Sequence, residues 1–297
     1  MNLDDWQERL RSAVDRVGDF ARRQVRRAKL RRRKAPRIGL ALGGGFARGL
    51  AHIGVLKVLE ESQIVVHCLA GTSVGSIIAG AYASGASVEE IAAVARKVRW
   101  KDFASWTLST MGLASNKRME AFLKRTFRSL RFEDMKRPLA VVATDLCTGQ
   151  PVVFKSGELV PAVRASCAYP GLFLPVAYQG AWLTDGGLVA AVPTRAAREM
   201  GADIVIGVTL ESINPNIEPQ NVMDVLSRSL SIAQRTAEPV WRAYADAVVS
   251  PQVNGYRWDE FERADELMAA GEEAMRKVLP DLKRLLEPSR RAHAVAR

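Results

Sequence analysis

The sequence predicts an α/β fold in which a mainly parallel central sheet is covered by helices. Short apolar runs typical of buried strands alternate along the chain with segments of helical periodicity. Two of the strand-to-helix junctions, at 43–49 and 71–75, are rich in glycine. The 297 residues suffice for one large catalytic domain, although length alone would also accommodate two.

The alternation sets the expected elements. Strands are expected near residues 38–43, 64–70, 139–145, 151–154, 181–184, 204–210 and 246–251. Helices are expected near 46–61, 74–84, 87–98, 116–128, 158–167, 193–200, 221–244 and 262–286. Residues 64–83 carry no charge when His67 is neutral, but their glycines and serines favour a strand followed by a helix over a membrane span.

The chain begins with a basic leader, residues 1–36. Residues 1–37 hold thirteen Arg or Lys and five Asp or Glu, a net charge of +8 out of +11 for the whole chain. Apolar residues recur there every three to five positions, including Trp6 and Phe20. The pattern predicts a basic amphipathic helix on an anionic membrane surface. Four alternatives stay open: docking on its own domain, a homo-oligomer contact, a solvated tail, or binding of nucleic acid. No nucleic acid is expected as a partner, because no nucleic-acid module accompanies the helix. No secretory signal is expected either, since this charged segment lacks an apolar core.

The first strand runs into a glycine-rich loop. The loop reads Gly43-Gly44-Gly45-Phe46-Ala47-Arg48-Gly49. Arg48 stands where a dinucleotide-binding pattern counted from Gly43 needs glycine, and no Gly-Lys-Ser/Thr follows. Such a loop leaves backbone N–H groups free to face an anion. An oxyanion hole is therefore the preferred interpretation.

The second junction has the form of a nucleophile elbow. Gly71-Thr72-Ser73-Val74-Gly75 follows an apolar strand and precedes a helix. The strand-to-helix turn is so tight that glycine is needed on both sides of the serine, and it exposes the hydroxyl at the top of the sheet. Ser73 is the candidate nucleophile, and an unremarkable serine in a packing turn is the alternative.

The base for Ser73 is less obvious. Only His293 follows the serine, in the basic C-terminal tail, whereas His67 lies in the strand before the elbow and His52 fits a core or capping role. Asp185, in Asp185-Gly186-Gly187, ends an apolar strand, where α/β folds place their chemistry. Taken alone, the motif favours a turn aspartate that bonds its own backbone.

Together these motifs resemble the patatin-like phospholipases. The loop with Arg48, the elbow Gly71-x-Ser73-x-Gly75 and Asp185-Gly186-Gly187 occur in that family's order. The bacterial relatives of the neuropathy-target-esterase catalytic domain are the closest likeness. Residues 39–56, 166–176 and 262–267 are similar to further family segments. The resemblance implies a patatin-like domain over 37–286, with its motifs within 38–198, between the leader 1–36 and a basic tail 287–297.

The resemblance also implies a patatin-like three-layer fold and roles for single residues. Ser73 is the expected nucleophile and Asp185 the general base of a dyad without histidine. The amides around Gly44, Gly45 and Phe46 are the expected oxyanion hole, with Arg48 ordering the loop. The motif glycines are Gly43, Gly49, Gly71, Gly75, Gly186 and Gly187. Many relatives have a small residue where this chain has Phe46, and the bulky phenylalanine side chain would narrow the entrance for the acyl chain. No cofactor or metal is expected.

The expected function is a serine lipid acyl hydrolase acting on phospholipid or lysophospholipid esters. A thioesterase, a general carboxylesterase and a non-catalytic regulatory protein on the same fold remain alternatives. Residues 100–115, rich in Trp and Met, are expected to pack in the core, with a lipid-contacting lid as the alternative. Cys68, Cys147 and Cys167 are expected to be small buried hydrophobes. They favour a reduced cytoplasmic setting. Together with the leader, this predicts a cytoplasmic protein that is peripheral at the inner face of the membrane.

Overall fold

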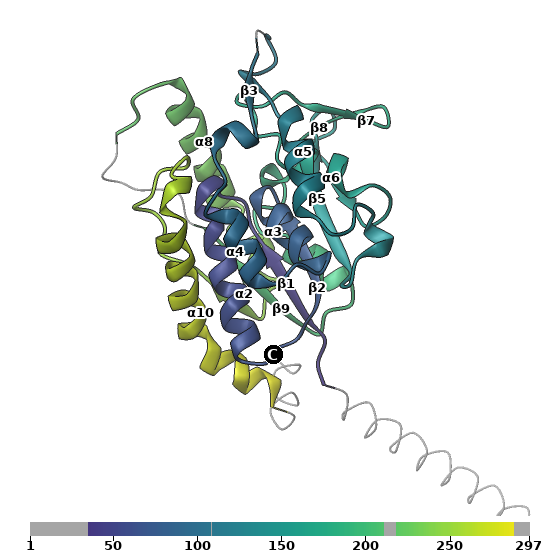
Figure 1. The fold of residues 1–297 in the computed structure, drawn as a ribbon, viewed down its shortest axis with the longest axis vertical. Helices are drawn as coiled ribbons and strands as arrows, with labels where there is room; N and C mark the ends of the chain where they lie inside the picture. The colour runs from purple at the N-terminus through teal and green to yellow at the C-terminus, as the bar shows by residue number, and fades with distance from the viewer. Residues whose placement is uncertain (1–34, 108, 211–217, 288–297) are drawn as a thin grey trace, which may run out of the picture. The chain divides into compact units, whose positions relative to one another are not determined.

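The computed structural model describes residues 35–107, 109–210 and 218–287, within which Arg37–Leu282 form one compact unit (Figure 1). Met1–Pro36 and Lys283–Arg297 group separately from it. The predicted leader helix, His293 and nearly all of the basic tail lie outside the described residues.

The centre of the unit is an eight-stranded sheet with the order β10-β9-β1-β2-β5-β8-β7, and β6 pairs with β5. The neighbours from β10 to β5 run parallel, whereas β8 and β6 pair antiparallel to β5 and β7 antiparallel to β8. The strands are β1 Ile38–Leu42, β2 Val66–Thr72, β5 Leu139–Asp145, β6 Pro151–Phe154, β7 Val176–Tyr178, β8 Ala181–Asp185, β9 Ile204–Val208 and β10 Ala247–Val249. A separate two-stranded hairpin pairs β3 Ser105–Trp106 with β4 Ala114–Ser115.

Helices cover the sheet. They are α2 Ala51–Glu61, α3 Val74–Ala83, α4 Val88–Ala95, α5 Lys117–Thr126, α6 Leu159–Ser166, α7 Thr194–Glu199, α8 Val222–Thr236, α9 Glu238–Arg242 and α10 Ala264–Leu286. Short 3₁₀ turns are η1 Phe46–Leu50, η2 Trp100–Asp102, η3 Phe132–Asp134, η4 Gly186–Leu188 and η5 Phe261–Arg263. Figure 1 shows α2 beside α10, where a Cβ on Gly54 would come within 1.9 Å of the Met268 carbonyl oxygen.

The alternation of side chains along the strands builds a core on each face of the sheet. On one face, Ala41 of β1 and Val205 of β9 pack with Ala197 of α7 and Trp241 of α9 in one buried cluster. The neighbouring residues Leu40 and Leu42 are fully buried and point to the opposite face. The sheet is therefore buried on both faces, as expected for parallel strands.

The register along β5 brings two strand ends together. Thr72, the last residue of β2, pairs with Val142, and Asp185, the last residue of β8, pairs with Ala143. β6 runs along Val141–Thr144 and occupies one edge of β5. β2 and β8 therefore share the other edge and meet end to end.

The expected α/β architecture is confirmed, with corrections of detail. The helix expected at 46–61 begins as the 3₁₀ turn η1, and that expected at 221–244 is divided into α8 and α9. Strands β3, β4 and β7 were not expected. The expectation that all three cysteines are buried is wrong for Cys147, which is exposed in the turn after β5, where its amide donates to Asp145 Oδ1. Cys68 and Cys167 are buried. Among the described residues, no helix is both long and apolar enough to cross a bilayer.

Candidate active site

Ser73 occupies a strained turn between β2 and α3. Its backbone has φ 54° and ψ −131°, in a region that non-glycine residues rarely adopt. A Cβ on Gly71 would lie 2.4 Å from Ser76 Cα, and one on Gly75 would lie 2.1 Å from the Leu42 carbonyl oxygen. The flanking glycines are therefore required by backbone contact, and the Ser73 side chain points into a cavity at the carboxyl end of the parallel strands.

Ser166, at the end of α6, holds the elbow against β5. The Ser73 amide donates to Ser166 Oγ at 2.8 Å, and that hydroxyl donates to the Val142 carbonyl at 2.6 Å. Ser166 is fully buried, so both hydrogen bonds are shielded from water. The sequence analysis did not single out this serine. Its signals in the sequence were its place at the end of an apolar helix and at the start of the family-like segment 166–176.

Asp185 lies at the end of β8 with one carboxylate oxygen engaged and the other not. The Gly187 amide donates to Oδ1 at 2.7 Å, whereas Oδ2 is buried without a hydrogen-bond partner among the described residues. Burial raises the pKa of Asp185 to about 6, and interaction with the nearby Ser73 hydroxyl and the Gly187 amide limits that rise. The unpartnered Oδ2 is thus available to accept a proton.

The glycine-rich loop folds over the same cavity. Gly45 has φ 159° and Phe46 φ 51°, which turn the chain sharply into η1. The Gly44 amide donates to the Ala191 carbonyl at 3.3 Å. Among the described residues, no backbone carbonyl accepts from the amides of Gly45 or Phe46, as is usual at a helix start. In this geometry the donors available to an anion are those of Gly45 and Phe46, and Gly44 is already engaged.

Two buried side chains support this loop. Arg48 is 8% exposed and its Nε donates to the Gly45 carbonyl at 3.4 Å; burial lowers its pKa to about 10. His52 Nε2 lies 2.9 Å from the Gly43 carbonyl oxygen and donates to it, while burial lowers the pKa of His52 to about 4. His52 is therefore neutral at pH 7 and acts as a core histidine, in agreement with the sequence analysis.

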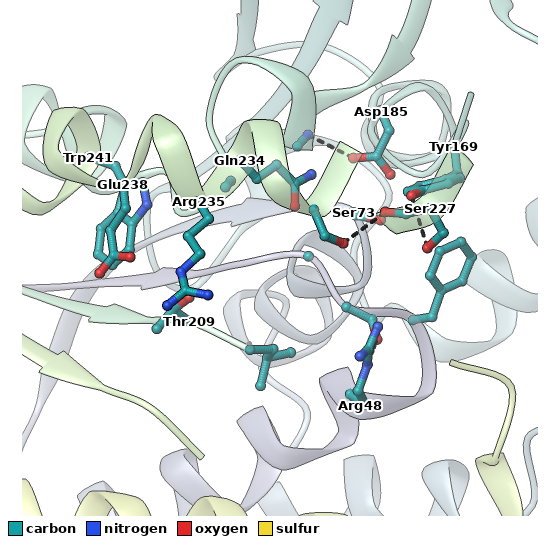
Figure 2. A pocket seen from close by; sticks show the side chains of 17 residues that line it. Arg48, Ser73, Tyr169, Asp185, Thr209, Ser227, Gln234, Arg235, Glu238 and Trp241 are labelled. Atoms are coloured by element: carbon teal, nitrogen blue, oxygen red, sulfur yellow. Dashed lines mark hydrogen bonds between the residues drawn. The ribbon is translucent and has the colours of Figure 1, made fainter. Parts of the chain in front are cut away.

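The main cavity has a volume of about 100 Å³ (Figure 2). Ser73 and Asp185 line one end together with Tyr169, and Arg235, Glu238 and Trp241 lie at the far end. Helix α8 contributes polar side chains to the lining, namely those of Ser227, Ser231, Gln234 and Arg235. The centroids of the Tyr169 and Phe46 rings lie 4.9 Å apart. The sequence analysis did not single out Tyr169.

A smaller cavity of about 40 Å³ meets the main one at Phe46 and Ser73. Its remaining lining is almost wholly apolar: Val74, Ile77, Trp100, Phe103, Met119, Cys167, Phe173 and Phe261. The segment 100–115 therefore divides. Phe103 is buried and Trp100 half-buried beside this cavity, whereas Trp106 is 73% and Met111 50% exposed.

Neither histidine of the described residues, His52 or His67, belongs to a second site. His67 lies in β2, where its Nδ1 accepts from the Ile38 amide. Within residues 35–107, 109–210 and 218–287, no group of three or more His, Cys, Asp or Glu is placed to hold a metal ion.

Comparison with known proteins supports one family. Residues 40–198 match the family model of the patatin-like phospholipases. The chain is 34% identical over 225 residues to "Lysophospholipase nte1" of Aspergillus fumigatus, which covers 73% of this chain and 14% of that protein. It is 33% identical over 185 residues to an uncharacterized NTE family protein of Mycobacterium tuberculosis, which covers 61% of this chain and 51% of that protein. The chain thus spans 14% of the length of the fungal relative and about half that of the mycobacterial one.

A solved structure supports the fold. The crystal structure of VipD from Legionella pneumophila superposes with a TM-score of 0.50 at 13% identity, covering 83% of this chain and 67% of that one. At this identity the likeness concerns the fold alone.

Proposed function

Because the chain belongs to the patatin-like phospholipase family, we propose that it is a serine hydrolase of lipid acyl esters, with phospholipids or lysophospholipids as substrates. The observation that carries the proposal is the meeting of Ser73 and Asp185 in one cavity. A nucleophile on a strained elbow faces a buried carboxylate whose Oδ2 lacks a partner among the described residues. Strain and an orphaned buried oxygen both cost stability, and a catalytic role explains why they are kept together.

The first half-reaction forms an acyl-enzyme. Ser73 Oγ attacks the ester carbon while Oδ2 of Asp185 accepts the hydroxyl proton. The amides of Gly45 and Phe46, which no described backbone carbonyl engages, donate to the oxygen that becomes negative, and the Gly44 amide would join them by leaving Ala191. When the intermediate collapses, the C–O bond to the alcohol breaks and the alcohol leaves with the proton from Asp185.

The second half-reaction releases the fatty acid. Asp185 takes a proton from water, which attacks the ester joining the acyl group to Ser73, and the proton then returns to Ser73 Oγ. A carboxylate with a pKa near its ordinary value is a poor base for an alcohol. The rise of the pKa of Asp185 to about 6 strengthens the base while leaving it mostly ionised at pH 7.5.

The two cavities suggest where the parts of the substrate lie. The apolar cavity bounded by Trp100, Phe173 and Phe261 suits an acyl chain, and the main cavity, with its serines and arginines, suits a polar head group. Phe46 stands between them and packs against Tyr169 and Trp258. The sequence-based expectation that Phe46 narrows the acyl entrance fits this placement.

The test combines labelling with product analysis. Wild-type protein should react with a fluorophosphonate and release fatty acid from lysophospholipid, and Ser73→Ala should lose both, with hydrolysis falling by at least about a thousandfold. Ser84→Ala is the control, since Ser84 caps the opposite end of α3. Undiminished lipid hydrolysis by a folded Ser73→Ala protein would disprove the mechanism. Fluorophosphonate labelling with turnover of acyl thioesters alone would instead favour a thioesterase.

A further inference from the structure

Helix α8 turns apolar side chains outward. Val222 is 81%, Val225 54% and Ile232 59% exposed, and Val240 on the following α9 is 68% exposed. None of the residues of α8 is buried. Isolated exposed apolar residues are ordinary, but a row of them along one helix marks a surface that binds something.

The opposite side of the same helix is polar and faces the main cavity. Ser227, Ser231 and Gln234 line that cavity. At 3.6 residues per turn, these three project from the side of α8 opposite to Val222, Val225 and Ile232. A helix on the surface of a globular protein normally turns apolar side chains inward, and α8 does so with Met223, which packs against the cluster that contains Phe173, and with Leu226, which lies beside Gly171. Val222, Val225 and Ile232 lie outside that inward side, so packing on the described core does not explain them.

The charged residues near the exposed apolar row of α8 indicate what kind of surface binds there. Arg228 projects between its two sides, and Arg235 lies at the exposed far end of the main cavity. No described acidic residue forms an ion pair with either of them. The nearby acids are engaged, because Glu238 pairs with Arg242 at 2.6 Å and Asp224 caps the start of α8. Apolar side chains near arginines that have no acidic partner among the described residues fit an interface of hydrocarbon and anionic head groups. There the arginine stems lie along the apolar layer and their charges reach the phosphates.

We propose that the outward face of α8 and α9, made of Val222, Val225, Ile232 and Val240, docks on a lipid surface that carries anionic head groups. The nature of the surface rests on the proposed function, since the substrate would be drawn from that lipid. Docking through α8 brings the cavity that holds Ser73 next to the lipid, because one helix forms both the docking face and part of the cavity wall.

The first experiment locates the inserted face in the full-length chain. An environment-sensitive fluorophore is attached at Ile232→Cys in a protein that also carries Cys147→Ser and Ser73→Ala. The first change removes the exposed native thiol, and the second makes the signal independent of hydrolysis. With vesicles of phosphatidylglycerol and phosphatidylcholine, the emission should shift to the blue and be quenched by lipids with a spin label in the acyl chain. The matched control is Val65→Cys, at a valine 63% exposed just before β2.

The proposal predicts quenching at position 232 and little at position 65. Equal quenching at both positions would overturn the proposal. So would an absence of quenching at position 232 when the protein sediments with the vesicles, or a failure of the protein to bind vesicles at all. Light scattering tests whether the face is instead a contact between copies of the chain. If the protein is a dimer, if the double variant Val225→Asp, Ile232→Asp is a monomer, and if the fluorophore at position 232 stays unquenched, the proposal is wrong.

A second experiment measures the consequence for turnover. The measured quantity is the rate of hydrolysis on vesicles divided by the rate on a soluble short-chain ester. The double variant Val225→Asp, Ile232→Asp should lower this ratio at least tenfold, and Val65→Asp should leave it unchanged. The soluble ester also reports that the variant is folded. An unchanged ratio contradicts the proposal. If the wild type hydrolyses neither substrate, the proposed function fails, and the fluorescence experiment still decides whether α8 docks.

Discussion

Thr72 and Asp185 pair with consecutive residues of one strand, Val142 and Ala143 of β5, although they lie more than a hundred positions apart in the chain. The end of β2 therefore meets the end of β8, and Ser73 follows the first of these residues directly. Ser166 closes the junction by joining the Ser73 amide to the Val142 carbonyl. The geometry of the proposed dyad thus depends on the register of a single strand.

The rate should depend on pH through Asp185. Because burial raises the pKa of this carboxyl to about 6, and the base must be ionised, kcat/KM should fall about tenfold per pH unit below pH 6 and level off above it. The measurement is a pH–rate profile on a soluble ester between pH 4.5 and 9, with the fold checked by circular dichroism at each end. A profile that is flat down to pH 4.5 would argue against Asp185 as the base.

Asp185→Asn should lose activity and gain stability. The amide cannot take the proton, so the rate should drop by orders of magnitude. Folding raises the pKa of this carboxyl from 3.8 to about 6. The protonated group therefore adds to the free energy of unfolding below pH 3.8, and this contribution, about 3 kcal/mol, is lost as the pH rises through 6. The variant should therefore unfold at higher urea than wild type at pH 7.5, and this advantage should vanish near pH 4. A destabilised variant at pH 7.5 would mean that the carboxylate is better solvated than its burial indicates.

Ser166→Ala should reduce kcat more than its effect on folding explains. Removing the hydroxyl leaves the Ser73 amide and the Val142 carbonyl without their partner, at a cost of about 1–3 kcal/mol for each unsatisfied group. Ser84→Ala is a matched control, because that buried hydroxyl also donates to one carbonyl and accepts from one amide. Both variants should lose stability, whereas only Ser166→Ala should lose kcat, by about tenfold or more for a displaced nucleophile. Equal kcat in the two variants would reduce Ser166 to a structural role.

Histidine should prove dispensable for the chemistry. His52 is neutral and turned to the Gly43 carbonyl, and His67 lies six residues before Ser73 in an extended strand, about 20 Å away. His67→Gln and His293→Ala should keep most of the activity on a soluble ester. An inactive but folded His293→Ala protein would restore a triad.

The leader stays a prediction from sequence alone. We propose that residues 1–36 bind anionic membrane through their charge, with each basic residue contributing about 1 kcal/mol in low salt. Deleting residues 1–35 should leave hydrolysis of a soluble ester nearly unchanged and sharply reduce sedimentation with phosphatidylglycerol vesicles. Binding by the full-length chain should weaken as salt is added. Equal vesicle binding by both proteins would favour docking of the leader on its own domain.

Much of the fold could be predicted because most of its strands lie in apolar runs. Every expected strand has a counterpart in the structure, whereas β3 and β4 were missed because two residues carry no measurable periodicity. β7 is as short as β10, but none of its residues is buried, whereas Ala247 and Val249 of β10 are. Pro239 marks the break between α8 and α9, since proline fits the first turn of a new helix. Cys147 was misplaced because the turn signals Asp145 and Gly149 on either side of it were overlooked.

The site could be predicted only where a motif recurs in a family. Ser73, Asp185 and the glycine loop carry such motifs, and the structure brings them to one cavity. The contributions of Ser166 and Tyr169 depend on contacts between distant segments, which no local pattern reveals. The engagement of the Gly44 amide depends in the same way on Ala191, far along the chain.

The turn between β5 and β6 offers a way to use this protein as a reporter. Gly149 has φ 68° and nothing within 4 Å of its Cβ position, so a chain break there disturbs little packing. Such a break leaves Ser73 on one fragment and Asp185 on the other, although both belong to the same edge of β5. Neither half can hydrolyse an ester alone by the proposed mechanism. Fusing the halves to two proteins of interest would therefore convert their association into ester cleavage.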